Sequence, residues 1–161
     1  MASRYWVGST DTWNATAGSK WSATSGGAGG SAVPTGLDDV FLDGASGAVT
    51  VTIGAGYDAL CLSLNCTGFT GTLAGGNGAS NLLVGSGASL GNVTFVSGMT
   101  FSGTWGSLIP LATSGTMNIT SNGLVLSGLS VGTSGGGNIT LLDALNLGTG
   151  ALSHNNAGTI D

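Results

Sequence analysis

Charged side chains are what this sequence most clearly lacks. They make up 6% of its 161 residues: Arg4, Lys20 and seven aspartates, with no glutamate, for a net charge of −5. A typical soluble domain carries about 25% charged residues, so a surface of solvated Glu/Lys helices is excluded. Binding to phosphate backbones or to anionic lipid headgroups requires several cations. We therefore expect neither nucleic acid nor a membrane as a partner.

Groups that carry chemistry are equally scarce. The chain has one histidine, His154, and two cysteines, Cys61 and Cys66. We find no nucleophile–base pair, phosphate-binding loop or metal-ligand constellation in the sequence, so we predict a protein that is not an enzyme and holds no cofactor. Cys61 and Cys66 lie about 16 Å apart in extended chain, so a disulfide between them would require a turn at Asn65. We expect one buried thiol and one at a corner, with His154 at a solvated corner.

Long apolar runs are also missing, and we expect no signal peptide. The sequence contains no run of about 18 apolar residues, the length that could span a bilayer. The start MASRYWVG lacks the apolar core of a signal peptide. The sequence predicts synthesis in the cytosol without general secretion. Its Gly, Thr, Ser and Asn content is nevertheless typical of extracellular β-proteins. A virus particle, which is assembled inside a cell and works outside it, reconciles the two observations.

Glycine and short alternating segments dominate what is present. Glycine occupies 32 positions, and residues 49–53, 60–64, 93–95 and 124–126 alternate apolar with small or polar side chains. Period-two alternation is typical of strands with one buried face. Apolar residues recur at helical spacing only with glycine in between, and each glycine costs a helix about 1 kcal/mol. The chain is predicted to be all-β.

A repeat of about 20 residues is visible from Val40 onward, which suits one coil of a parallel β-solenoid. The best internal match aligns residues 115–121 with 136–141, and residues 91–95 hold a third Asn-aliphatic-Thr copy. We predict about six coils over residues 37–161. An antiparallel β-sandwich or jelly roll remains the alternative, because its short strands have similar spacing. The expected coils begin near Val40, Ala59, Ser80, Thr100, Ser121 and Leu141.

Residues 1–36 differ from the rest, since they hold three of the four tryptophans and both cations. The tryptophans are expected to pack as a cluster over the open end of the solenoid, because natural proteins cover such edges. The glycine-dense stretch 25–31 is either a flexible linker or part of this cap. We predict that the cap also attaches the protein to a larger partner, through Arg4, Trp6, Trp13, Lys20 and Trp21.

The N-terminal motifs occur in a recognisable order: Trp13-Asn14, Trp21-Ser22, a glycine-rich stretch, Pro34 and Asp38-Asp39-Val40-Phe41. This order resembles the opening segment of Gly/Thr-rich β-solenoid virion proteins of tailed bacteriophages, of tail-fibre or capsid-decoration type. Residues 61–73 and 139–148 are similar to recurring units of such proteins, and bacterial autotransporter passengers are more distantly similar. The resemblance implies a structural virion protein that forms a homotrimer on a larger capsid or tail protein. A bacterial cell surface is the alternative location.

The acidic residues offer weak candidates for sites. Asp38, Asp39 and Asp43 are the one acidic cluster, but a calcium loop needs six to eight oxygen ligands and a DxDxDG-type pattern. We therefore expect turn-capping carboxylates there, with a metal site as the alternative. Asp58 and Asp143 are isolated in sequence and do not suggest the carboxylate pair of a glycosidase.

Trp105 is the candidate for the second function that we consider, a carbohydrate-binding module for receptor recognition or adhesion at a cell or virion surface. It lies in the stretch Gly103-Thr104-Trp105-Gly106, and an exposed aromatic ring there could contact a glycan. The alternative is a tryptophan buried between coils.

Overall fold

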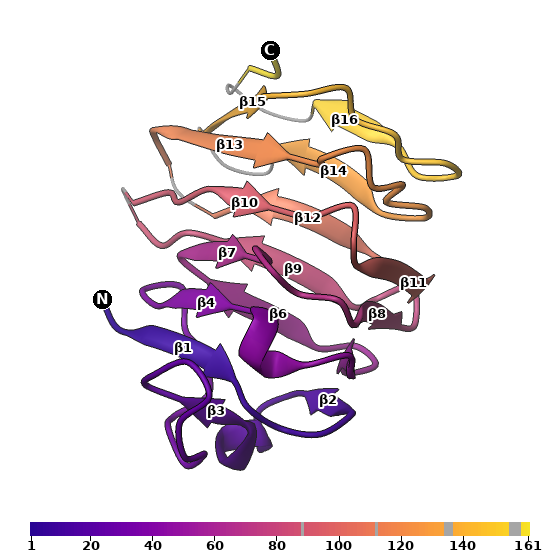
Figure 1. Ribbon diagram of the computed structural model, residues 1–161. Coiled ribbons are helices and arrows are strands. Elements are labelled where there is room, and N and C mark those ends of the chain that lie inside the picture. The colour runs from indigo at the N-terminus through magenta and orange to yellow at the C-terminus, as the bar shows by residue number, and fades with distance from the viewer. Residues whose placement is uncertain (88, 112, 134–136, 155–158) are drawn as a thin grey trace.

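The computed structural model describes residues 1–87, 89–111, 113–133, 137–154 and 159–161. Within them the chain winds through three sheets whose strands lie one above another, from the N-terminal end to the C-terminal end (Figure 1). Two short 3-10 turns, η1 (Ala17–Lys20) and η2 (Gly44–Ser46), are the helical elements of this part. None of its helices is long and apolar enough to cross a membrane.

The seven-stranded sheet is the largest of the three. Its order is β15 (Asn138–Leu141), β13 (Thr116–Thr120), β10 (Val93–Thr94), β7 (Ser63–Asn65), β4 (Asp39–Phe41), β1 (Ser3–Trp6) and β3 (Trp21–Ser22).

The other two sheets complete each turn of the chain. The four-stranded sheet has the order β11 (Thr100–Thr104), β8 (Thr72–Gly76), β5 (Thr50–Ile53) and β2 (Asp11–Trp13). The five-stranded sheet has the order β16 (Leu152–His154), β14 (Ser130–Thr133), β12 (Ser107–Pro110), β9 (Asn81–Val84) and β6 (Asp58–Cys61).

Every pairing between named strands is parallel except that of β3 with β1. The strands β4, β5 and β6 place one segment on each sheet, and β7 then pairs with β4 to begin the next turn. This confirms the predicted parallel β-solenoid and excludes the antiparallel sandwich.

The turns are longer than the repeat inferred from the sequence and unequal in length, so the predicted six coils are corrected to about four turns. Equivalent core positions of the seven-stranded sheet pair from turn to turn as Val40–Leu64, Leu64–Val93, Val93–Ile119 and Ile119–Leu141. The turn that ends at Val93 is the longest of these, and the turn that ends at Leu141 is the shortest. The expected coil starts consequently fall on different sheets: Val40 lies in β4, whereas Ala59 lies in β6.

Alternation of side chains builds the core as expected. In β5, Val51 and Ile53 are fully buried, while Thr50 and Thr52 face outward. The run 60–64, by contrast, is not one strand. It crosses a corner at Leu62 between β6 and β7, where Cys61 and Leu62 are both buried, so the alternation of buried and outward side chains is interrupted as the chain changes sheet. Residues 124–126 form a single parallel bridge, Val125 to Asn146, because turns flank them closely.

The Asn-aliphatic-Thr copies are only partly in register. Asn92 and Asn118 stack on adjacent turns, and the Asn118 side-chain amide donates to Asn92 Oδ1 over 3.0 Å. The copy that begins at Asn138 is displaced by two residues, since Asn138 pairs with Thr116. A slip of two residues keeps every side chain on its own face, so the sheet tolerates it.

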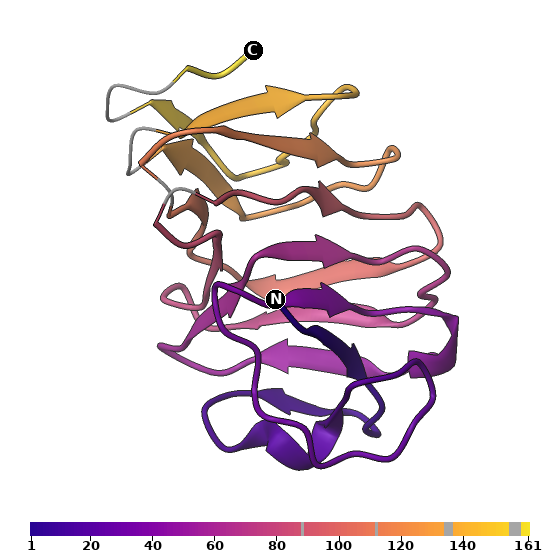
Figure 2. The ribbon, with the colours of Figure 1, turned by 90° about the vertical axis from the view of Figure 1, so that its left-hand side faces the viewer.

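Residues 1–36 form both the first turn and the end of the stack. Strands β1 and β2 pair in parallel with β4 and β5, and β3 then lies antiparallel along the outer edge of β1. Figures 1 and 2 show this segment at the N-terminal end of the solenoid. Inside it, Trp6, Trp13 and Trp21 have no exposed surface and pack edge to face, with centroids 5.1 and 4.9 Å apart. The predicted tryptophan cluster is confirmed.

Candidate functional site

The tryptophan cluster cannot itself be a docking surface. All three rings are fully buried, and within the described residues their indole N–H groups have no hydrogen-bond acceptor. Edge-to-face packing is therefore the main specific interaction of these rings. The predicted attachment role of Trp6, Trp13 and Trp21 is corrected on this point, because a partner cannot reach rings that stabilise the folded cap.

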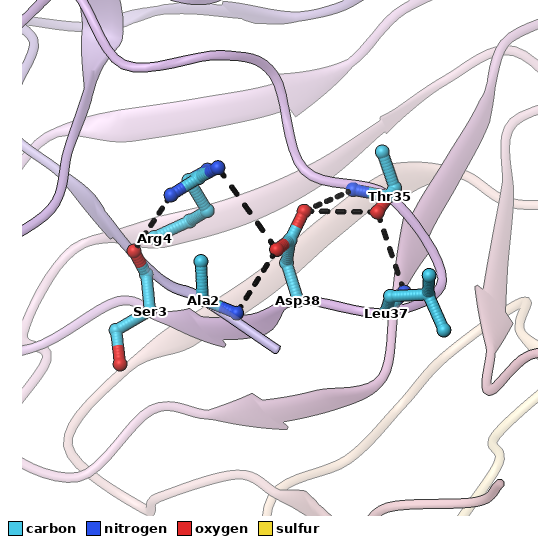
Figure 3. A network of polar contacts seen from close by, with 6 residues as sticks. All are labelled: Ala2, Ser3, Arg4, Thr35, Leu37 and Asp38. Carbon is cyan, nitrogen blue, oxygen red and sulfur yellow. Dashed lines mark hydrogen bonds and ion pairs between the residues drawn. The ribbon is translucent and has the colours of Figure 1, made fainter.

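Arg4 lies beside Asp38 at the start of the seven-stranded sheet (Figure 3). Arg4 Nη2 is 3.9 Å from Asp38 Oδ1, and Arg4 Nη1 donates to the Ser3 carbonyl over 3.2 Å. Asp38 also accepts from the Ala2 main-chain N–H and from both the N–H and the hydroxyl of Thr35. Asp38 thus holds the turn before β4 against β1, and Arg4 has an internal counter-ion.

Lys20, the other cation, is also paired within the cap. Lys20 Nζ is 2.7 Å from Asp11 Oδ2, and this hydrogen bond lowers the pKa of the Asp11 carboxyl. Both residues border an open polar pocket of about 160 Å³. A partner could reach Arg4 or Lys20 only in competition with these carboxylates.

The acidic cluster does not converge on one point. Asp38 caps the preceding turn, and Asp43 caps η2 by accepting from the N–H groups of Ala45 and Ser46. These two confirm the expected turn-capping role. Asp39 differs, because it faces outward from β4 and accepts from the Ser63 hydroxyl on β7. The described part of the chain contains no group of three or more His, Cys, Asp or Glu side chains that could hold a metal ion.

The two isolated aspartates each support a local contact. Asp58 accepts from the Asn81 side-chain amide over 2.7 Å, across the β6–β9 pair. Asp143 accepts from the N–H groups of Ser121 and Asn122, and these bonds lower the pKa of its carboxyl.

Both cysteines are buried and free, which corrects the expectation that one would lie at a corner. Burial raises the pKa of both thiols far above the ordinary value. His154 ends β16, and its side chain lies outside the described part of the structure, as does the expectation made for it.

Trp105 is buried as well, with 5% of its surface exposed. Its ring stacks on Phe101 at a centroid distance of 4.4 Å, and its Nε1–H donates to the Ser102 carbonyl over 2.6 Å. One face of the Trp105 ring is therefore covered by Phe101, and the rest of the ring is buried in the protein, so no face is free for a sugar. The prediction of Trp105 as a glycan contact is wrong, and the interpretation as a core tryptophan holds.

A groove on the outward face of the seven-stranded sheet was not predicted from the sequence. It has a volume of about 360 Å³ and crosses β4, β7 and the chain entering β10. The signal that could have identified it is the set of outward positions on three adjacent strands, but using this signal requires the register between turns. Its main lining side chains are Asp39, Phe41, Ser63, Asn65, Asn92 and Thr94.

The aromatic end of this groove is fixed by stacking. The Phe41 ring lies parallel to Tyr5 on β1, with centroids 4.5 Å apart and an angle of 13° between the rings. Tyr5 does not line the groove, whereas Phe41 does. Tyr5 therefore covers one side of the Phe41 ring, and Asn65 of β7 is the in-register neighbour on the other side.

No family model, curated protein or solved structure matches this chain.

Proposed function

We propose that this protein is a non-enzymatic structural component of a phage virion, as a capsid decoration or tail-fibre element. The observation that carries the proposal is a parallel solenoid, ended by a tryptophan-packed cap, on a chain with 6% charged residues. The N-terminal motifs that resemble phage solenoid proteins lie in that cap and in β4.

The fold suits a rigid building block rather than a mobile catalyst. Each turn forms main-chain hydrogen bonds with the turn before it and the turn after it, as in the β4–β7–β10 stack. Such stacking distributes stability between neighbouring turns and holds an extended surface in a fixed shape. A decoration or fibre protein needs these properties.

We further propose that the chain forms a homotrimer bound to a larger capsid or tail protein. A surface with few charges has weak defence against association, which is tolerable where partners cover it. Association also stabilises the folded state by mass action. The trimeric symmetry comes from the resemblance, and the need for partners comes from the composition.

The test is whether the chain travels with particles. An antibody against the purified chain is used to follow it through a density gradient of phage particles grown on their host. We expect the signal in the particle band, retained after a high-salt wash because few ion pairs hold it. Signal confined to the soluble fractions overturns the proposal.

A further inference from the structure

We propose that the groove on the outward face of the seven-stranded sheet, between Phe41 and Thr94, binds a neutral oligosaccharide. This goes beyond the structural role proposed above, and it places recognition at a surface other than the one around Trp105. The groove combines an aromatic side chain, several polar side chains, a single carboxylate and a close main-chain contact at Gly91.

The aromatic wall is the half-buried ring of Phe41. Its orientation is set by the parallel Tyr5 ring behind it. On the side away from Tyr5, the in-register neighbour of Phe41 is Asn65 of β7, and both residues line the groove. An aromatic face of fixed orientation suits the apolar C–H face of a sugar ring, because both surfaces are flat and rigid and little conformational entropy is lost on contact.

Four polar side chains of the groove each already form a hydrogen bond within the protein, and this determines which donors and acceptors they have left for a ligand. Asn65 Oδ1 accepts from the Thr67 N–H, and Asn92 Oδ1 accepts from the Asn118 amide, so the Nδ2 group is what each of the two asparagines has left to offer a ligand. Ser63 donates to Asp39 Oδ1, which leaves the Ser63 oxygen and Asp39 Oδ2 as acceptors.

The acceptors Asp39 and Ser63 are paired neighbours on β4 and β7, and the donors Asn65 and Asn92 lie next to them on β7 and just before β10. These strands are about 4.8 Å apart, and the Thr94 hydroxyl can act as donor or acceptor. Sugar hydroxyls also both donate and accept, so a row of them matches this arrangement. A ligand with acceptors alone would give no donor to the Ser63 oxygen and Asp39 Oδ2.

The charge of the groove selects against acidic ligands. Asp39 is its one titratable side chain. The two cations of the whole sequence, Arg4 and Lys20, lie beside Asp38 and Asp11 in the cap and do not line it. A uronate, sialate or phosphate group would meet a carboxylate with no compensating cation. The expected ligand is therefore uncharged.

The floor of the groove is rigid at Gly91. A Cβ atom at this position would lie 2.5 Å from the Leu62 carbonyl oxygen and 2.6 Å from Ser63 Cβ. Gly91 N–H also donates to that carbonyl over 3.0 Å. The close approach keeps the chain entering β10 low against β7, which preserves the depth of the groove.

The experiment titrates the purified full-length chain with neutral oligosaccharides of glucose, mannose, galactose or N-acetylglucosamine, and with oligogalacturonate as the acidic probe. Calorimetry gives the affinity, and NMR follows the side-chain amides of Asn65 and Asn92 against that of Asn77, which lies outside the groove. We expect at least one neutral probe to bind, to shift the Asn65 and Asn92 signals and to leave Asn77 unmoved.

The variants separate the groove from the fold. Phe41→Leu is expected to weaken binding by about tenfold or more, and Phe41→Tyr to restore it. Thr94→Ala, which removes one groove hydroxyl, weakens binding several-fold, and it carries the test if Phe41→Leu unfolds. The matched control is Thr52→Ala, an outward threonine of β5 on the four-stranded sheet, which leaves affinity unchanged.

Three outcomes overturn the proposal. One is that no neutral probe binds at about 10 mM, as would follow if copies of the chain cover the groove. Another is stronger binding of oligogalacturonate than of every neutral probe. The third is an affinity that Phe41→Leu and Thr94→Ala leave equal to that of Thr52→Ala.

Discussion

Several polar side chains of this protein act by binding main-chain groups of another turn. Ser46 is the clearest case, because it is buried, donates its hydroxyl to the Trp6 carbonyl over 2.8 Å and accepts from the Asp43 N–H over 3.0 Å. Asp43 in return accepts from Ala45 and Ser46, which completes a capping box around η2. This small network links the second turn of the solenoid to the tryptophan cap.

Replacement of Ser46 by alanine should therefore destabilise the cap. The change leaves the Trp6 carbonyl and the Asp43 N–H without this partner in a buried site, so we expect the free energy of unfolding to fall by about 1–3 kcal/mol. Denaturant titration measures it. The control is Ser25→Ala at an exposed position, expected to stay within about 0.5 kcal/mol of the parent. Equal effects of the two changes would contradict the role given to Ser46.

The buried thiols give a second prediction at this scale. Burial raises the pKa of both Cys61 and Cys66, so neither is a thiolate in the folded chain at pH 8. We expect a thiol reagent such as dithionitrobenzoate to leave the native protein unlabelled and to label both cysteines after denaturation.

Linkage fixes the sign of the pH effect. Above the ordinary thiol pKa of 9.0, only the unfolded chain releases these protons, so stability should fall as the pH rises further. Rapid labelling of the native chain would show that the two thiols are accessible.

Residue roles could be predicted where they depend on near neighbours in sequence. The capping roles of Asp38 and Asp43 follow from a short polar side chain before a turn, and both are confirmed. The burial of Trp105 and Cys66 depends on which sheet each residue reaches. This placement depends on the lengths of the solenoid turns, which the sequence alone does not determine.

At the scale of elements, the critical contacts are those between successive turns. Gly91 precedes β10 and lies directly against Leu62 and Ser63, at the start of β7. Gly78, by contrast, follows β8 at an exposed position, where an added Cβ would meet only Thr104 Cγ2 at 3.8 Å. The two glycines thus provide a crowded position and an open one in the same fold.

Gly91→Ala should consequently cost about 1–3 kcal/mol of unfolding free energy, since the main chain of β7 or of residue 91 must move. Gly78→Ala, its matched control, should leave stability near that of the parent. Thermal unfolding followed by circular dichroism compares them. If Gly91→Ala is as stable as Gly78→Ala, the close approach of these two turns is not a constraint on the fold.

Strands could be predicted where alternation is confined to one sheet. Residues 49–53 satisfied this condition and form β5, with Val51 and Ile53 inside. Residues 60–64 did not, because the apolar alternation in their sequence runs across the corner at Leu62, where the chain moves from β6 to β7 and two consecutive side chains, Cys61 and Leu62, are buried. The repeat length was underestimated for a related reason: the connections between strands vary in length, so that equivalent core positions are unevenly spaced along the chain.

For the whole molecule, composition predicted the class of fold, but it could not predict the groove. Abundant glycine and few charges indicate an all-β solenoid, which the stacked sheets confirm. The groove requires Asp39, Ser63 and Asn92 to lie on adjacent strands, and only the observed register places them there.

The prediction for the whole molecule is that it assembles as a homotrimer. Because only 6% of the residues are charged, few solvated charges oppose contact between copies. We expect native mass spectrometry of the purified protein to show a mass of three times that of the single chain. A chain that stays monomeric over the accessible concentration range would remove the proposed trimer.

The most direct test of the virion proposal is to count copies of this chain in purified particles. Isotope-labelled peptides of the chain and of the major capsid and tail proteins give its number per particle by mass spectrometry. The proposal predicts a fixed number that is a multiple of three and is the same in independent particle preparations. A number far below one per particle, or one that varies with the purity of the preparation, would contradict it.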